Sequence, residues 1–89
     1  MRESTVTIVN RLGLHARAAG KFVNLAKTFS SEISLAKETE EVDAKSIMAV
    51  MLLAAPLGTE LSLKVSGADE DEAAEALIRL IEDRFGEED

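Results

Sequence analysis

The chain of 89 residues contains no cysteine, no tryptophan, no tyrosine and a single histidine. Without cysteine it can form neither a disulfide nor a thiolate metal site, and one histidine cannot build a multi-histidine cluster. We therefore expect neither a metal ion nor a bound cofactor.

Long apolar stretches are also missing. The longest, residues 47–57, is too short to span a bilayer. Residues 1–10 alternate polar and apolar side chains instead of forming the apolar block of a signal peptide. These patterns predict a cytoplasmic protein that does not insert into a membrane.

Positive charge is scarce, and it is unevenly distributed. The net charge of −7 argues against binding to nucleic acid, because phosphate backbones require a basic surface. Residues 1–30 hold five basic residues and one acidic residue, whereas residues 31–89 hold five basic and sixteen acidic ones. The first third is thus a basic segment of an acidic protein, and His15 lies within it.

The length suits one domain over residues 1–89, and the apolar residues, 46% of the chain, are interleaved with charges as in a folded globular protein. Alternating apolar residues predict strands at 5–9, 33–35 and 61–66, and a weaker strand around Val42.

Helical spacing of apolar residues predicts three helices. The first spans residues 16–27, with an inward stripe of Ala19, Phe22, Val23 and Ala26. The second runs from 47 to about 54, before Pro56 and Gly58. The third carries the stripe Ala74, Leu77, Ile78, Ile81 and Phe85.

The ends of the third helix carry two further expectations. Asp69 and Glu72 resemble a capping box at its start. After it, we expect residues 86–89 to be frayed.

The predicted order is β-α-β-β-α-β-α. Alternating strands imply a sheet with one buried face, which the helices can cover while the other face meets water. The fold class is therefore α+β, a two-layer sandwich. Many unrelated functions use such folds, so the fold alone does not identify one.

His15 is the leading candidate for chemistry. It ends a glycine-containing loop and directly precedes the first helix. Unpaired amide groups at a helix start bind phosphate readily, and the helix dipole adds about half a positive charge there. Arg17 places a permanent positive charge two residues away. The imidazole nucleophile, the anion-binding amides and the positive charge of Arg17 thus lie within three residues. This arrangement fits transient phosphorylation of the histidine.

The second helix is apolar on nearly every side. If Val50, Leu53 and Leu57 point inward, then Ile47, Met48 and Met51 form an outward apolar ridge. Such a ridge is typical of a contact surface, and methionine suits one that must fit several partners.

Ser46 is expected to cap this helix. A phosphate on Ser46 would be tolerated by the helix start and would place about two negative charges beside the ridge.

Three segments resemble the HPr family, the histidine phosphocarriers of the bacterial phosphotransferase system. Residues 13–17 with Ala19 resemble its phosphorylation motif, residues 45–48 its regulatory serine, and residues 67–70 the segment before its last helix. The spacing agrees without gaps over essentially the whole chain.

The resemblance implies a four-stranded antiparallel sheet covered on one face by three helices. It implies that enzyme I, using phosphoenolpyruvate, phosphorylates His15 at Nδ1 with assistance from Arg17. IIA proteins or domains would then accept the phosphoryl group. In some bacteria a serine kinase/phosphorylase modifies the serine that corresponds to Ser46.

The docking surface implied by the resemblance comprises Ile47, Met48 and Met51 on the second helix and Gly20, Asn24 and Lys27 on the first. A carrier must present His15 freely, which favours a monomer. One departure is Ala18, where the family usually has proline; alanine keeps the helix but is expected to loosen the His15 loop.

Several alternatives stay open. Residues 10–13 and the acidic tail resemble the nitrogen-related branch of the family, whereas residues 45–48 are typical of carriers regulated at the serine. From another class, a small-molecule-binding regulatory domain of similar layout would make His15 incidental. An acylphosphatase-like hydrolase is a more distant alternative.

Overall fold

The computed structural model describes residues 1–88, whose elements follow the predicted order. They are β1 (Arg2–Thr7), α1 (Ala16–Ala26), β2 (Glu32–Lys37), β3 (Glu40–Asp43), α2 (Ile47–Leu52), β4 (Glu60–Ser66) and α3 (Glu70–Glu82), followed by a 3₁₀ turn at Arg84–Gly86. The weak third strand around Val42 is confirmed as β3. No helix within residues 1–88 combines the length and apolar character needed to cross a membrane.

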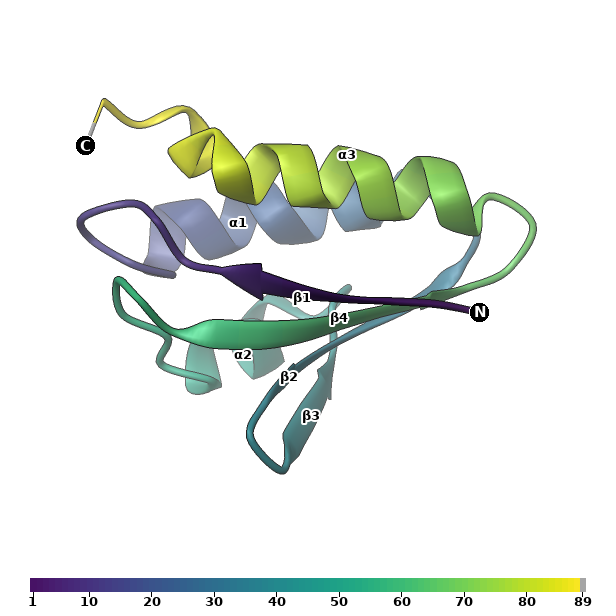
Figure 1. The fold of residues 1–89 in the computed structure, drawn as a ribbon, viewed down its shortest axis with the longest axis horizontal. Coiled ribbons are helices and arrows are strands. Elements are labelled where there is room, and N and C mark those ends of the chain that lie inside the picture. Colours follow the sequence, from purple (N-terminus) through teal and green to yellow (C-terminus); the bar gives the residue numbers. More distant parts are fainter. Residues whose placement is uncertain (89) are drawn as a thin grey trace.

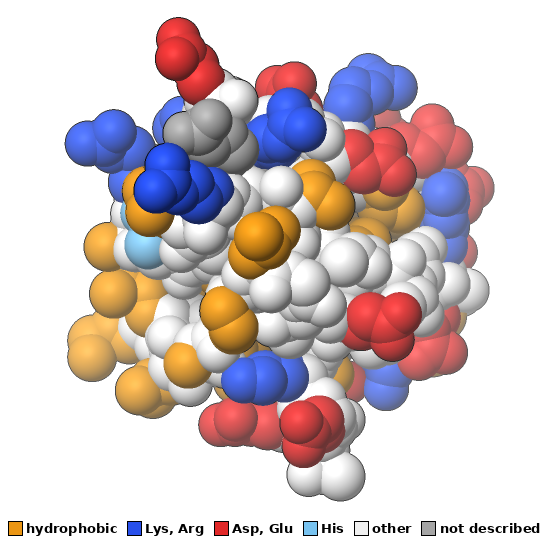
Figure 2. Space-filling view, turned by 60° about the vertical axis from the view of Figure 1, so that its left-hand side comes forward, with side chains coloured by type: hydrophobic (Ala, Val, Ile, Leu, Met, Phe, Trp, Pro, Cys, Tyr) orange, Lys and Arg blue, Asp and Glu red, His pale blue; other side chains and the backbone are white. Residues whose placement is uncertain are grey.

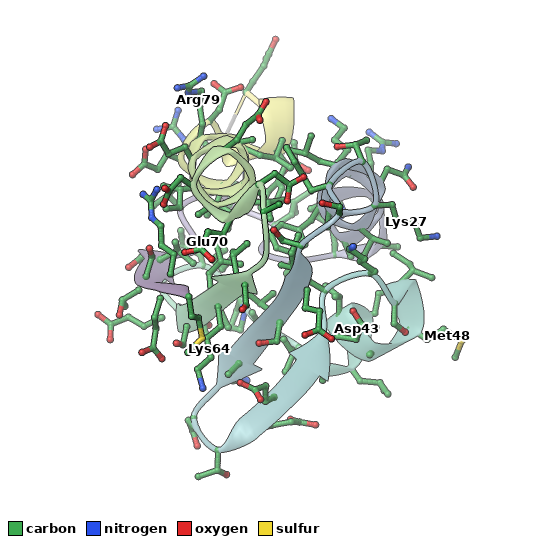
Figure 3. The ribbon with its side chains drawn as sticks, turned by 90° about the vertical axis from the view of Figure 1, so that its right-hand side faces the viewer. Lys27, Asp43, Met48, Lys64, Glu70 and Arg79 are labelled. Atoms are coloured by element: carbon green, nitrogen blue, oxygen red, sulfur yellow. The ribbon has the colours of Figure 1, made fainter. Side chains whose placement is uncertain are left out.

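The strands form one antiparallel sheet in the order β1-β4-β2-β3. The helices lie on one side of this sheet, with α1 and α3 side by side above it and α2 beside β3 (Figures 1 and 3). The predicted α+β two-layer sandwich with a four-stranded antiparallel sheet is confirmed.

The core lies between the sheet and the helices. In β4, Leu61, Leu63 and Val65 are buried, whereas Ser62 and Lys64 alternate with them on the open face. The predicted stripe of α1 is buried in full, together with Ala18. Ala18 is fully buried, so its methyl group packs into the core at the first turn of α1.

The first strand begins earlier than predicted. It spans Arg2–Thr7 instead of residues 5–9, because β4 supplies partners from Val65, opposite Arg2, down to Glu60, opposite Thr7. Ile8 lies beyond the strand but stays buried, and its backbone bonds Gly58 and Thr59. The limits of β1 are set by its pairing with β4, a strand distant in the sequence, and the alternation of apolar residues carries no information about that pairing.

The second helix ends earlier than predicted, at Leu52 instead of about residue 54. Val50 and Leu53 are buried as expected, but Leu57 is 56% exposed, so its predicted inward position is wrong. The cause is the backbone of Ala54, whose φ of 50° leaves the helix and breaks its periodicity.

The predicted capping box at Asp69 is also wrong. The Asp69 side chain makes no bond to the first turn of α3. Its carboxylate instead accepts bonds from the backbone N–H groups of Ser30 and Ser31, at 2.9 and 3.0 Å, and from the Ser31 hydroxyl. Asp69 thereby fastens the start of α3 to the connection between α1 and β2.

The end of α3 differs from the predicted continuous helix. The helix stops at Glu82, and Arg84 and Phe85 have φ values of 56° and 54°. Phe85 is nevertheless fully buried, and its carbonyl accepts a bond from Lys21 Nζ at 2.7 Å. After this turn the tail continues beyond the end of α3, on the side of the molecule where α1 begins (Figure 1).

We predict that Asp69→Asn lowers the melting temperature at neutral pH. Chiefly the Ser31 hydroxyl, and then the Ser30 amide, lower the pKa of Asp69 from 3.8 to about 2. This stabilisation is therefore present above pH 3.8 and is lost as the pH falls toward 2.

Thermal unfolding followed by circular dichroism across that range tests this prediction. The Asp69→Asn variant should lose less stability than the wild type on acidification. Glu72→Gln, which alters the other member of the expected capping box, is the control and should change little. Equal effects of the two substitutions would contradict the assignment.

Candidate functional site

His15 occupies the N-cap position of α1. Its carbonyl accepts the first helical bond from the Ala19 amide at 2.8 Å, and its Nδ1 accepts a bond from the Arg17 amide at 3.2 Å. The side chain is 28% exposed. One ring nitrogen therefore points at the unpaired amides of the first helical turn, where an anion is favoured.

The loop before His15 is held from both sides. The Leu14 amide donates to Ala55 O at 2.8 Å, which ties the loop to the segment after α2. Gly13 has a φ of 72°, and a Cβ there would lie 2.7 Å from Ala55 O and 2.8 Å from Pro56 Cα. Glycine is required because the backbone is both left-handed and in close contact.

Asn10 is the polar centre of this loop and is fully buried. Its Nδ2 donates to Gly13 O at 2.8 Å and to Glu87 Oε1 at 3.0 Å, while its Oδ1 has no partner within residues 1–88. The opposite amide orientation would turn Oδ1 toward two acceptors, so the two donated bonds fix the orientation. Asn10 thus joins the loop to the tail.

The C-terminal tail completes the site. Glu87 Oε2 lies 2.5 Å from His15 Nε2, although the two residues are 72 positions apart in the sequence. The prediction that residues 86–89 are frayed is therefore wrong for Gly86 and Glu87, whose backbones also bond Asp83 and Arg84, and Asp89 lies outside the described residues. The tail is ordered because Phe85 is buried and Glu87 finds two partners.

Hydrogen bonding lowers the pKa of Glu87 below its ordinary value. The bond from Asn10 contributes most, and the contact with His15 and the charge of Lys21 add to it, while partial burial opposes them. Glu87 is therefore a carboxylate at neutral pH and acts only as an acceptor.

A hollow of about 600 Å³ opens beside His15. Besides His15, it is lined by Arg11, Leu12, Ala16, Arg17, Glu87 and Glu88, and the Arg17 and Glu88 side chains are exposed. On this face basic side chains, the histidine and a group of hydrophobic side chains lie near one another (Figure 2). The hollow thus offers positive charge and helix amides next to an imidazole nitrogen.

The basic segment of the first third does not form one patch. Arg11, Arg17, Lys21 and Lys27 belong to the His15 loop and α1. Arg2 instead bonds Asp71 and Glu75 of α3, at 3.5 and 3.3 Å. Within residues 1–88, no three histidine, aspartate or glutamate side chains are close enough to hold a metal ion.

The apolar ridge predicted on α2 is present. Ile47, Met48 and Met51 are 37%, 72% and 43% exposed, and Leu52, which the sequence did not suggest, is 72% exposed. Met48 projects from α2 away from the body of the protein (Figure 3). Ser46 caps the helix as predicted, because its hydroxyl accepts a bond from the Ala49 amide at 3.3 Å.

The three residues expected on α1 lie next to this ridge, since α1 and α2 pack together. Asn24 and Lys27 are exposed. Gly20 is half-buried, and a Cβ at its position would meet open space. The two parts of the expected docking surface therefore lie on neighbouring helices, with Gly20, Asn24 and Lys27 along α1 and at its C-terminal end.

Sequence reasoning missed two residues of the site. In the sequence, Asn10 belongs only to the segment that resembles the nitrogen-related branch, and Glu87 only to the tail that we expected to be frayed. No local pattern marks either of them, because each acts through the other across 77 positions of sequence. Only the buried Phe85 ahead of the tail hinted that the chain end is held.

A family model described as "PTS HPr component phosphorylation site" matches residues 2–83. The chain is 49% identical to the phosphocarrier protein HPr of Cupriavidus necator, over 98% of both sequences.

Solved structures agree with the sequence match. The crystal structure of HPr-C-His from Thermoanaerobacter tengcongensis aligns with a TM-score of 0.95 at 49% identity, covering 99% of both chains. A crystal structure described as an HPr dimer from the same organism aligns with a TM-score of 0.79 at 48% identity, covering 98% of this chain and all of that one.

The small α+β sandwich and the partly exposed histidine at the start of a helix thus define one class of protein, the histidine phosphocarriers. The chain belongs to the HPr family. It is a phosphocarrier of the phosphotransferase system, a protein relayed between enzymes and not an enzyme with its own turnover.

We predict that Gly13→Ala destabilises the protein more than Gly58→Ala does. Both glycines have left-handed backbones, with φ of 72° and 91°, but a Cβ at Gly58 would meet nothing within 4 Å. Gly58→Ala should therefore cost only the backbone strain, about 1–2 kcal/mol. Gly13→Ala should add a further clash of about 1–3 kcal/mol.

Urea unfolding of the two variants measures the difference, because the backbone strain is common to both. Equal losses would contradict the close contact between the His15 loop and residues 55–56.

Proposed function

We propose that His15 is the residue that carries the phosphoryl group, bonded at Nδ1. Enzyme I would supply the group, originally from phosphoenolpyruvate, and IIA proteins would receive it for sugar uptake or for regulation. The observation that carries the proposal is the bond from the Arg17 amide to Nδ1. A nitrogen that accepts a bond carries no proton, so Nδ1, which faces the start of α1, can act as a nucleophile once the amide releases its lone pair.

The transfer step follows from this geometry. The Nδ1 lone pair forms the new N–P bond, and the bond between phosphorus and the donor breaks with its electron pair leaving on the donor. For this bond to form, the Arg17 amide must first leave the Nδ1 lone pair, and it can then donate to a phosphoryl oxygen at the positive end of the helix dipole. The Arg17 guanidinium can pair with another phosphoryl oxygen from the rim of the hollow.

Catalysis in such a carrier is mostly positioning and charge stabilisation. The bonds of the loop orient the His15 ring, and the partial exposure of the ring lets a phosphorylated partner reach it. Both features favour catalysis by positioning. We propose that the protein acts as a monomer in the cytoplasm, since a partner must reach the hollow.

For docking, the ridge of Ile47, Met48 and Met51 and the adjoining Gly20, Asn24 and Lys27 are the proposed surface for enzyme I and IIA proteins. The ridge supports this role because it is apolar, exposed and next to the site. Ser46, at the start of α2, is the proposed target of a serine kinase/phosphorylase. A phosphate there would set negative charge against partners that dock on the ridge.

Incubation with enzyme I and phosphoenolpyruvate should give an acid-labile phosphorylated protein. Because His15 is the only histidine of the chain, His15→Ala should abolish the adduct completely. Phosphate incorporation, measured with labelled phosphoenolpyruvate before and after mild acid treatment, provides the readout. If the folded wild-type protein acquires no acid-labile phosphate, the proposed function is wrong.

Ser46→Asp should raise the KM for phosphorylation by enzyme I about tenfold and leave kcat nearly unchanged, which corresponds to about 1.4 kcal/mol of weaker docking. Aspartate is a good N-cap, so the fold should persist. Ser66→Asp, at an exposed position in β4, is the matched control and should leave KM unchanged. Similar effects of both substitutions would argue against docking at the start of α2.

A further inference from the structure

The contact between Glu87 and His15 has no counterpart in the phosphorylation motif, since it comes from the tail. Glu87 uses both carboxylate oxygens: Oε1 accepts the bond from Asn10, and Oε2 lies 2.5 Å from His15 Nε2. The Glu87 side chain is only 17% exposed. Three anchors therefore fix the carboxylate beside the ring: buried Phe85, buried Asn10 and His15 itself.

The two ring nitrogens of His15 have different partners. A carboxylate only accepts, so Nε2 must carry a proton to bond Glu87. The Arg17 amide only donates, so Nδ1 must present its lone pair. Both contacts thus favour the same tautomer, with the proton on Nε2 and the nucleophile on Nδ1.

We propose that Glu87 is a positioning residue for phosphoryl transfer, which holds the His15 ring as the Nε2–H tautomer and stabilises the charge that the ring acquires. The proposal deepens the proposed function and rests on it. It assigns to the C-terminal tail a part in the transfer that the sequence motif around His15 does not contain.

The charge balance of the step explains why a carboxylate helps. When Nδ1 gives its electron pair to phosphorus, Nε2 keeps its proton, and the ring becomes positively charged. The Glu87 carboxylate lies against this proton and stabilises the charged ring, as an aspartate does beside the histidine of a Ser-His-Asp triad. In the onward transfer the N–P bond breaks, its electron pair returns to Nδ1, and the neutral Nε2–H ring is restored.

Other charges near the ring do not replace Glu87. Arg11 and Arg17 line the hollow, and Lys21 contributes positive charge at Glu87. These cations favour the incoming phosphoryl oxygens but oppose positive charge on the ring. Glu88 also lines the hollow, but within residues 1–88 Glu87 is the acidic residue that bonds the ring, so its removal takes away the carboxylate that lies against Nε2–H.

Glu87→Gln is the test, because it keeps the shape of the side chain and removes its charge. Glu88→Gln is the matched control, since Glu88 carries the same charge and lines the same hollow but is exposed and, within residues 1–88, makes no bond to the ring. Glu87→Asp keeps the charge and should restore part of the effect. Circular dichroism verifies that all variants are folded.

Two readouts separate positioning from docking or folding. With the carrier varied as the substrate of a catalytic amount of enzyme I, Glu87→Gln should lower kcat by about tenfold or more, with KM for the carrier nearly unchanged, as expected for loss of an orienting partner of histidine. In ¹⁵N NMR at a pH where the ring is neutral, the wild type should show Nε2 protonated and Nδ1 bare. Glu87→Gln should show a larger share of the Nδ1–H tautomer.

The outcomes are distinguishable from those of the proposed function. If the wild type acquires no phosphate on His15, the proposed function itself fails. If the wild type is phosphorylated and Glu87→Gln matches it in kcat and tautomer, the role of Glu87 is refuted. Equal losses in Glu87→Gln and Glu88→Gln refute it as well, because they would reflect overall charge.

Discussion

The buried amide of Asn10 is the constraint on which the site depends. It bonds Gly13 O within the loop and Glu87 Oε1 in the tail, so it fixes two segments that meet only in the folded protein. Between these segments lies His15, held at Nδ1 by the first turn of α1 and at Nε2 by the tail. A buried polar group of this kind specifies one geometry, because any other arrangement leaves its donors unpaired.

The sheet and helices place the contacts of Asn10, His15 and Glu87 near the proposed docking surface on α1 and α2. Ile8 bonds Gly58 and Thr59, and Leu14 bonds Ala55, so the His15 loop is tied to the chain that leaves α2. The apolar ridge of Ile47, Met48 and Met51 therefore lies next to the start of α1. The proposed site and the proposed docking surface lie on neighbouring helices, α1 and α2, while the open face of the sheet carries polar residues such as Lys64 (Figure 3).

Much of the fold could be predicted from local patterns. The stripe of α1, the alternation of β4 and the cap at Ser46 each depend on neighbours within a few positions. The predictions were wrong where segments distant in the sequence determine the local structure. The limits of β1 depend on its pairing with β4, and the Asp69 side chain bonds Ser30 and Ser31 instead of capping α3. At Ala54 and Phe85, left-handed backbones ended helical periodicity, and such turns at residues other than glycine have no strong sequence signal.

The sequence by itself determined the order of the elements, the position of His15 before a helix and the apolar character of residues 47–53, since these follow from composition and spacing. Only the tertiary structure decided that the tail reaches His15, that Asn10 is buried and that Leu57 faces outward. The physical reason is that a hydrogen bond across 72 or 77 positions depends on the path of the whole chain, which no local pattern records.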